Sequence, residues 1–244
     1  MINFVINFPL KLNTRFLPLN KSNGKNKIQP AYVSNPIYNG IATKAEIELA
    51  AQMNPKIKTI LSENNISLEV NFNELEKLMQ GHMQQTYIVV TKVYHSLPEN
   101  MKQKIDLSAL QEAALLHDCG KTLIPDKILN KKGRLDPEER KIMELHGELG
   151  YELLKEKGLK KRTLELIKYH HQDKNNNGYP KVTSSFEFDV DAQILSIADK
   201  YSALREKRSY KNPLAKYEAL EIIAKEVNNG NISQEVYTAL VRSV

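Results

Sequence analysis

Five histidines and two aspartates of this sequence are candidates for chemistry, because each lies near an end or on an apolar face of a predicted helix. They are His82, His117, Asp118, His146, His170, His171 and Asp199. Any one buried histidine, taken alone, is more often a packing or hydrogen-bonding residue than a ligand. Asp199, however, interrupts the apolar run 194–198, where a lone carboxylate is costly to bury. Several helices thus present an imidazole or a carboxylate, and we predict that these groups share a metal site.

The types of these side chains narrow the choice of metal. Imidazole nitrogens and carboxylate oxygens without a thiolate fit Fe, Mn, Ni, Co or Zn and argue against a structural zinc–cysteine site; of these we expect Fe or Mn first. Cys119 is the one cysteine of the chain, and as the helical neighbour of Asp118 it should point away from the site. We expect two divalent ions, because a carboxylate such as that of Asp118 can bridge two cations about 3.5–4 Å apart.

The charge of such a site indicates its substrate. Two divalent cations and two carboxylates leave a net charge of about +2, since neutral histidines add nothing, and this charge suits a phosphodiester. Lys121 follows Asp118 by three residues and could place a positive charge beside a phosphate oxygen. The residues therefore favour an anionic phosphate ester as the substrate.

Helical periodicity predicts the elements that carry these residues. The apolar positions between residues 73 and 97 follow a helical period, and His82 falls on the same stripe. No alternating strand pattern continues beyond residues 67–72, and no internal repeat is present, so the sequence predicts an all-α fold. The predicted helices cover about 43–53, 73–97, 109–118, 136–158, 161–171, 191–206 and 213–228.

Capping residues set the limits of several of these helices. Asp136, followed by Pro137 and by Glu139 at the third helical position, is a strong start signal. The helix that it opens should extend to Gly158 and carry His146 midway along its length. Thr43 with Glu46, and Ser108 with Gln111, form two further capping boxes.

Charge and composition divide the chain into three parts. Residues 1–58 hold eight of the 35 Lys and Arg but two of the 29 Asp and Glu, so the rest of the chain is balanced, with 27 of each sign. We expect an extended, disordered leader at 1–42, a short helical lead-in at 43–72 and a catalytic domain at 73–244. The basic leader carries no nucleic-acid-binding motif. No apolar run is long enough to span a membrane, and no signal peptide is recognised, so the cytoplasm is the expected location.

Ordered motifs between about residues 74 and 240 resemble those of the HD-GYP phosphodiesterases, a subfamily of the HD-domain metal-dependent phosphohydrolases. The motifs are His-Asp-Cys-Gly-Lys at 117–121, Ile-Pro-Asp-Lys-Ile at 124–128, Leu-Asp-Pro-Glu-Glu at 135–139, His-Gly-Glu-Leu-Gly at 146–150, His-His at 170–171, Gly-Tyr-Pro at 178–180, Ile-Ala-Asp-Lys-Tyr-Ser-Ala-Leu at 197–204 and Arg-Ser-Tyr-Lys at 208–211. The resemblance implies a compact multi-helix HD-domain bundle.

The resemblance also implies roles for individual residues. The five histidines and two aspartates occupy metal-ligand positions, and Lys121 matches a phosphate-contacting lysine. Arg208 and Lys211 match positions that hold the substrate's phosphates, and Tyr179 lies in the loop that shapes the site. The implied reaction is hydrolysis of cyclic di-GMP by a hydroxide held between two metal ions, with Asp118 and Lys121 as catalytic residues. His95 lies outside every motif and is expected to be a surface or capping residue.

Several positions depart from the family pattern. Leu78 occupies the place of a glutamate that supports a third metal ion in some members, so we expect two ions here. Gln172 replaces a glutamate, and Asn175 and Asn176 replace Asp-Gly, where asparagine is the best substitute for glycine at positive φ. Ser209 replaces a proline. None of these changes removes a predicted ligand, but they leave the substrate open.

Two other functions remain compatible with these residues. The chain could hydrolyse another nucleotide or phosphoester, or it could be a degenerate module that binds a nucleotide or a signalling partner without turnover. The intact set of predicted ligands and Lys121 favour the enzyme. The sequence shows no receiver or sensor domain, and it does not indicate the oligomeric state.

Overall fold

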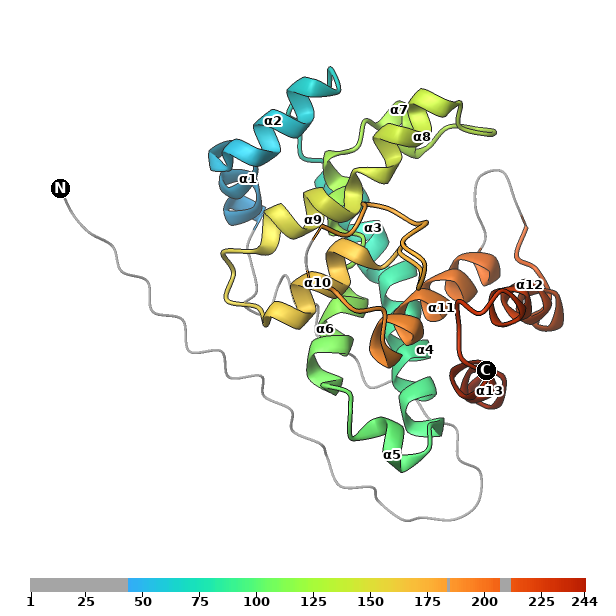
Figure 1. The fold of residues 1–244 in the computed structure, drawn as a ribbon. Helices are drawn as coiled ribbons and strands as arrows, with labels where there is room; N and C mark the ends of the chain where they lie inside the picture. The colour runs from blue at the N-terminus through green and yellow to red at the C-terminus, as the bar shows by residue number, and fades with distance from the viewer. Residues whose placement is uncertain (1–43, 184, 207–211) are drawn as a thin grey trace, which may run out of the picture.

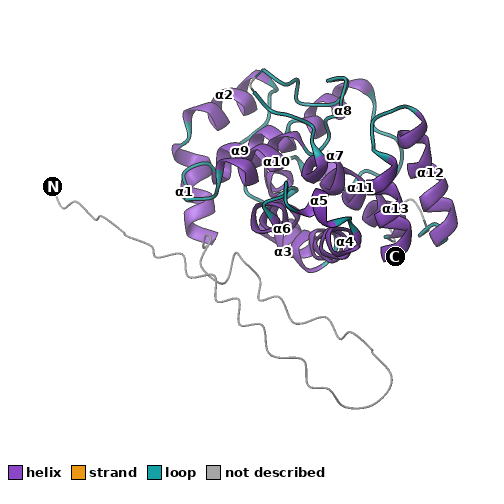
Figure 2. Cartoon of the chain, turned by 60° about the horizontal axis from the view of Figure 1, so that its bottom comes forward, coloured by secondary structure: helices purple, strands orange, loops and turns teal. Residues whose placement is uncertain are grey.

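The computed structural model of the chain describes residues 44–183, 185–206 and 212–244 (Figure 1). The predicted leader, the Thr43 cap, and the departure and phosphate contacts at Arg208, Ser209 and Lys211 lie outside these residues. The described residues form helices and loops without a β-strand (Figure 2), so the predicted all-α fold is confirmed for them. None of the described helices combines the length and the apolar character that crossing a membrane requires.

The structure contains more and shorter helices than the sequence predicts. In chain order the elements are α1 (Lys44–Met53), α2 (Pro55–Glu63), α3 (Phe72–Gln80), α4 (His82–Ser96), α5 (Glu99–Lys102), α6 (Leu107–Leu116), the 3-10 helix η1 (Cys119–Leu123), α7 (Asp126–Leu129), α8 (Pro137–Glu144), α9 (His146–Leu154), α10 (Lys161–Tyr169), α11 (Val190–Arg205), α12 (Lys216–Asn228) and α13 (Gln234–Ser243).

Helix α4 runs through the centre of the molecule, and α6, α11 and α13 pack against it. Its buried residues Val89 and Val90 lie four and three positions before the buried Val93, so the three valines form one apolar stripe. Burying each valine contributes about 1.5–3 kcal/mol. Helix α6 contributes the small residues Ala113 and Ala114, both fully buried, which allow close packing of helices. This packing holds the ends of α4, α6 and α11 near one another.

A second group, α9 and α10, packs against α6 and η1. Gly120 makes the contact between η1 and α9 possible, because a Cβ atom at this position would lie 2.0 Å from the carbonyl oxygen of His146 and 2.5 Å from the nitrogen of Gly150. No side chain fits such a distance. The close approach brings Asp118, two residues before Gly120, to the start of α9.

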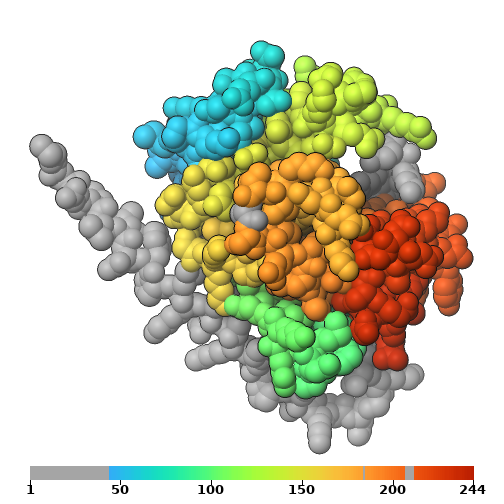
Figure 3. Space-filling model, viewed as in Figure 1, coloured from blue at the N-terminus to red at the C-terminus, as the bar shows by residue number. Residues whose placement is uncertain are grey.

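The other helices surround this core. α1 and α2 pack on α9, α8 joins α9, and α12 and α13 pack on α11. In the view of Figure 3, the loop after α10 and the start of α11 (orange) lie at the centre of one face, between α9 and α10 (yellow) and the C-terminal helices (red). The loop on this face carries the Gly-Tyr-Pro sequence 178–180.

Two predicted long helices are each broken in two. The helix expected over residues 73–97 ends at Gln80 and starts again at His82, because Gly81 has φ −108° and ψ −99° and leaves the helical conformation. The helix expected over residues 136–158 changes at Leu145, so that His146 begins α9 and does not lie midway along a helix. Both breaks place a candidate ligand at the start of a helix.

Smaller differences concern the helix limits. The cap of α6 is Asp106, whose side chain accepts a hydrogen bond from the nitrogen of Ala109, and Ser108 lies inside the helix. The capping box of Asp136 and Glu139 is confirmed. α2 and α13 were not predicted; Asn54 caps the first and Ser233 the second.

Candidate metal centre

The structure brings the seven predicted ligand residues together from five helices. They lie at the start of α4 (His82), after α6 (His117 and Asp118), at the start of α9 (His146), after α10 (His170 and His171) and within α11 (Asp199). All are buried except His171, whose side chain is 28% exposed. His95 is exposed near the end of α4, as predicted.

The carboxylate of Asp118 lies between two groups of histidines. Its Oδ2 atom is 3.7 Å from Nε2 of His82 and 3.6 Å from Nε2 of His117. Its Oδ1 atom is 3.6 Å from Nε2 of His146 and 3.9 Å from Nε2 of His170. Two donors that bind one tetrahedral ion at about 2.0–2.2 Å stand roughly 3.4 Å apart. Asp118 therefore presents one oxygen to each of two groups with ion-binding dimensions.

Asp199 also faces both groups. Its Oδ1 atom is 2.8 Å from Nε2 of His82 and 3.6 Å from Nε2 of His117, and its Oδ2 atom is 3.8 Å from Nδ1 of His171. The donor atoms thus form one group of His82, His117 and Asp199 and another of His146, His170 and His171, and a third group of His117, Asp118 and His170 overlaps both.

Three of the histidines are oriented by the backbone. Nδ1 of His117, His146 and His170 lies 3.0, 2.7 and 2.8 Å from the carbonyl oxygen three residues earlier. A carbonyl oxygen only accepts, so each Nδ1 carries the hydrogen and each Nε2 keeps a lone pair. The lone pairs are directed into the centre, which is the orientation that metal ligands need.

The residues fit a bound cation. Nε2 of His146 and Nε2 of His170 lie 3.1 Å apart, and in the tautomer fixed by the backbone two lone pairs face one another, which is repulsive without a cation beside them. Nε2 of His117 and Oδ1 of Asp118 are buried without a hydrogen-bond partner among the described residues. Each unsatisfied buried group costs about 1–3 kcal/mol. A divalent ion held by nitrogen and oxygen satisfies all of them.

The electrostatic environment favours neutral imidazoles at His146 and His171 and an ionised carboxylate at Asp118. Burial lowers the pKa of His146 to about 3, with a further contribution from Lys121, and burial lowers the pKa of His171 to about 4. Burial opposes ionisation of Asp118, but the positive charge of Lys121 outweighs it and holds the pKa of this carboxyl well below its usual range. Neutral imidazoles and ionised carboxylates are the forms that bind a cation.

His82 differs from the other histidines. Burial lowers its pKa, but the carboxylates of Asp199, Glu206 and Asp118 outweigh burial and raise the pKa to about 9. These carboxylates favour the protonated imidazole, so a cation that binds its Nε2 must displace the proton held there.

Lys121 and Cys119 flank Asp118 in different ways. Nζ of Lys121 donates a hydrogen bond of 2.6 Å to Oδ2 of Asp118, and its side chain remains 18% exposed, so the ammonium group lies at the edge of the centre. The Cys119 thiol points toward the carbonyl oxygen of Gly150, 3.9 Å away, and burial raises the pKa of this thiol. Cys119 points away from the centre, as expected.

The loop after His171 borders the centre and is organised by Gln172. The amide nitrogen of this buried side chain donates to Oδ1 of Asn176 and to the carbonyl oxygen of Pro180, each at 2.8 Å. Its amide oxygen accepts from the backbone nitrogens of Asp173 and Gly178 at 3.0 and 2.9 Å. Asn176 has φ 57°, which agrees with the positive φ expected from the sequence. The side chains of Gln172 and Asn176, which both differ from the residues of the family pattern, are thus hydrogen-bonded to one another.

Tyr179 and Gly178 shape the part of this loop closest to the histidines. The Tyr179 ring centroid lies 4.7 Å from that of His171 and 6.1 Å from that of His146. Gly178 allows the close approach, since a Cβ atom there would lie 2.0 Å from the carbonyl oxygen of His171. The predicted site residue Tyr179 therefore lies beside the second group of histidines.

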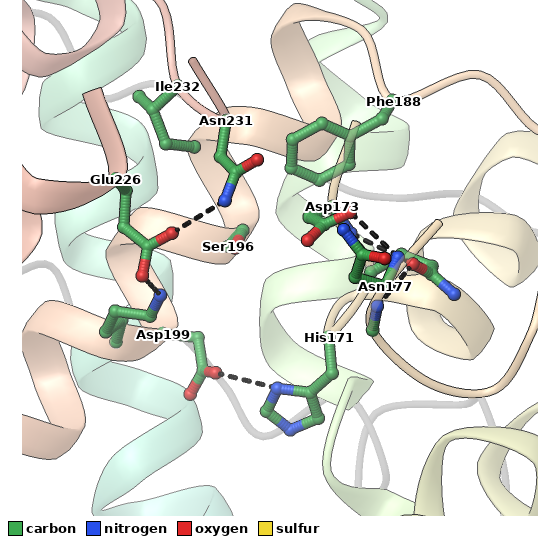
Figure 4. A pocket seen from close by; sticks show the side chains of 12 residues that line it. His171, Asp173, Asn177, Phe188, Ser196, Asp199, Glu226, Asn231 and Ile232 are labelled. Atoms are coloured by element: carbon green, nitrogen blue, oxygen red, sulfur yellow. Dashed lines mark hydrogen bonds and ion pairs between the residues drawn. The ribbon is translucent and has the colours of Figure 1, made fainter. Parts of the chain in front are cut away.

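A cavity of about 210 Å³ opens beside the centre (Figure 4). His171 and Asp199 form its border with the metal centre, and Phe188 offers an aromatic ring on another side. On the part of the lining that α12 provides, Glu226 accepts hydrogen bonds from Lys200 (2.5 Å) and Asn231 (3.1 Å). The cavity thus combines polar groups with an aromatic surface next to the two groups of ligands.

Sequence reasoning missed two parts of the site. Glu206 lies 3.5 Å from Nδ1 of His82, and its spacing of seven residues from Asp199, which places both on one face of a helix, was an available signal. The cavity side chains Phe188 and Asn231 come from a loop and from the segment before α13, and no local pattern indicates that they meet.

Residues 69–236 match the family described as HD domain. The chain is 40% identical over 108 residues to 3'3'-cGAMP-specific phosphodiesterase 2 of Vibrio cholerae, across 43% of this chain and 20% of that protein. It is 34% identical over 142 residues to a cyclic di-GMP phosphodiesterase of Thermotoga maritima, across 57% of this chain and 38% of that protein. The chain thus spans less than half the length of these two relatives.

A solved structure supports the fold. Bd1817, described as a HDG"Y"P protein from Bdellovibrio bacteriovorus, superposes with a TM-score of 0.50 and 16% identity, across 84% of this chain and 65% of that chain. At this level of identity the likeness concerns the arrangement of helices alone.

Proposed function

Because the chain belongs to the HD domain family, we propose that it is a metal-dependent phosphohydrolase that cleaves a cyclic dinucleotide, with cyclic di-GMP as the first candidate. The observation that carries the proposal is the position of Asp118, whose two carboxylate oxygens face two separate groups of imidazole nitrogens at 3.6–3.9 Å. A carboxylate in this position supports a centre of two ions, Fe or Mn in the first place.

The ligand residues divide between the two ions. His82, His117 and Asp199 would hold one ion, and His146, His170 and His171 would hold the other, with Asp118 between them. When bound, two divalent ions supply Lewis acidity and lower the pKa of a bound water. The carbonyl anchors of three histidines fix their Nδ1 atoms, so that their Nε2 lone pairs would be available to the ions with little reorganisation.

Other residues would hold the substrate. Lys121 remains partly exposed beside Asp118, where its ammonium group can offset negative charge on the phosphoryl group. Tyr179 lies against His171 and would contact the part of the substrate next to the second ion. Arg208 and Lys211 stay in the proposal as phosphate contacts because they match the family's motif.

The names of the relatives support a cyclic dinucleotide as the substrate, and they point to two such compounds. The Thermotoga maritima protein is named for cyclic di-GMP and the Vibrio cholerae protein for 3'3'-cGAMP. The second is a real alternative here, because the relative named for it is 40% identical and this chain departs from the family pattern in the loop beside the site. Both substrates carry the anionic phosphodiesters that the charge of the centre suits.

Incubation of the Mn(II)-loaded chain with cyclic di-GMP and with 3'3'-cGAMP tests the proposal, with product analysis by chromatography. We expect a linear product from at least one of the two. Binding of two Mn(II) ions without cleavage of either compound would contradict the substrate and favour another phosphoester or a binding module. A chain without affinity for Mn(II), Fe(II) or Zn(II) would contradict the enzyme itself.

A further inference from the structure

His82 lacks the backbone anchor that the other fully enclosed histidines share. Nδ1 of His117, His146 and His170 each donates to the carbonyl oxygen three residues earlier. Nδ1 of His82 is buried and makes no hydrogen bond of normal geometry with any residue that the structure describes. An imidazole held at one nitrogen alone can change its tautomer or rotate, and both movements turn Nε2 away from a metal.

The backbone before His82 explains this difference. His146 also begins a helix, but Leu145 before it keeps helical angles of φ −68° and ψ −18°, so the carbonyl group of Met143 stays within 2.7 Å of its Nδ1. Gly81 has φ −108° and ψ −99°. The break at Gly81 sets α4 apart from α3, and the carbonyl group three residues before His82 does not reach its ring.

Glu206 occupies the position where that carbonyl group is missing. It caps the C-terminal end of α11, and its Oε2 atom lies 3.5 Å from Nδ1 of His82. On the opposite side of the ring, Oδ1 of Asp199 lies 2.8 Å from Nε2. Asp199 and Glu206 are seven residues apart, two turns of one helix, so α11 presents a carboxylate to each nitrogen of this imidazole.

We infer that Glu206 is a positioning residue: its carboxylate accepts the Nδ1 hydrogen of His82 and thereby directs Nε2 toward the metal centre. A carboxylate bonded to the second nitrogen of a metal-bound imidazole fixes the tautomer and makes the ligand more basic. The contact must shorten by about 0.6 Å to reach the length of a charge-assisted hydrogen bond. The Glu206 side chain is 38% exposed. The inference rests on the proposal that His82 binds a metal.

Binding of Mn(II) to the full chain tests this inference, with titration followed by electron paramagnetic resonance to count the bound ions. Glu206→Ala should weaken one of two sites by about 10–100-fold and leave the other unchanged. Glu206→Gln should weaken the same site less, because its amide oxygen still accepts a hydrogen bond but carries no charge. Glu165→Gln is the matched control: Glu165 is a partly exposed carboxylate paired with Lys161 and Arg162, and binding should equal that of the wild type.

His82→Ala separates this inference from the proposed function. We expect it to bind one Mn(II) ion per chain. If His82→Ala loses an ion while both Glu206 variants bind like the wild type, the role of Glu206 is wrong and the two-metal centre stands. If His82→Ala keeps two ions at wild-type affinity, His82 is not a ligand, and both the inference and this part of the proposed function fail. Circular dichroism of each variant verifies that its helices are intact.

Discussion

The candidate metal centre and the loop that borders it are held in place by different groups. In the centre, His117, His146 and His170 are oriented by backbone carbonyl groups, which are present whatever the side chains around them are. In the loop over residues 171–180, one side-chain amide, that of Gln172, bonds to four partners. The predicted ligands keep the residue types that the resemblance implies, whereas Gln172 and Asn176 in the loop do not.

The comparison indicates how each region can change. A centre anchored by the backbone keeps its orientation while its surroundings vary, but it cannot lose a ligand. In a loop anchored by side chains, a substitution at one position removes a hydrogen bond unless its partner residue is substituted as well. Gln172 and Asn176 illustrate such a pair, because the amide nitrogen of the first donates to the side-chain oxygen of the second. A glutamate at position 172 could not donate this bond.

Removal of a ligand should have the largest effect. We expect Asp118→Asn or His117→Ala to lower turnover by more than about 1000-fold, because each removes a donor from the centre that stabilises charge in the reaction. The rate of phosphodiester cleavage at saturating Mn(II) measures this effect. His95→Ala, which changes an exposed histidine of α4, should leave the rate unchanged. Equal rates in the ligand variants and in His95→Ala would contradict the centre.

Removal of the metal should destabilise the fold. Each ion present at 100 times its Kd stabilises the folded state by about 2.7 kcal/mol, so two ions contribute about 5.4 kcal/mol, which corresponds to about 10–20 °C in a domain of this size. Treatment with a chelator should therefore lower the melting temperature by this amount, and Mn(II) should restore it. In Asp118→Asn the chelator should have little effect, and a full shift in this variant would argue that the ions bind elsewhere.

A change of Gln172 to Glu should destabilise the loop. The new carboxylate would face the carbonyl oxygen of Pro180 and Oδ1 of Asn176, both acceptors, at the 2.8 Å that the amide nitrogen now occupies. We expect a loss of about 1–3 kcal/mol in the free energy of unfolding and a higher KM for the dinucleotide. Urea unfolding measures the first. Gln234→Glu, at an exposed position in the first turn of α13, is the control and should change stability by less than about 0.5 kcal/mol.

A change of Asn176 to Gly should have the smallest effect. Glycine adopts the φ of 57° without cost, but the variant loses the bonds that Asn176 accepts from Gln172 and from the backbone nitrogen of Val182. We expect a net loss of about 1 kcal/mol or less. Combined with Gln172→Glu, the two losses should be less than additive by at least about 0.5 kcal/mol. Strict additivity would mean that the two positions are not coupled.

The sequence was sufficient for the parts of the molecule that follow local rules. The all-α fold follows from helical periodicity, and the start of α8 follows from the capping box of Asp136 and Glu139. The ordered motifs identified the family, which the match over residues 69–236 confirms. The seven candidate ligands do converge, although their binding of metal stays a prediction.

The sequence was insufficient to predict helix limits and side-chain pairs that depend on tertiary contacts. The apolar stripe continues through Gly81 with Met79 and Met83 both buried, so periodicity alone predicts one helix where the structure has two. The low helix propensity of glycine was the one local signal of the break. The pairing of Glu206 with His82 joins residues of different helices, and the link between Gln172 and Asn176 depends on a loop conformation that no period describes.

The most direct test of the account is a crystal structure of the Mn(II)-loaded chain with anomalous scattering measured at the manganese edge. We expect two anomalous peaks, one on each side of Asp118. The first should lie among His82, His117 and Asp199, and the second among His146, His170 and His171. A single peak would contradict the bridging position of Asp118, and peaks away from these residues would contradict the metal centre as a whole.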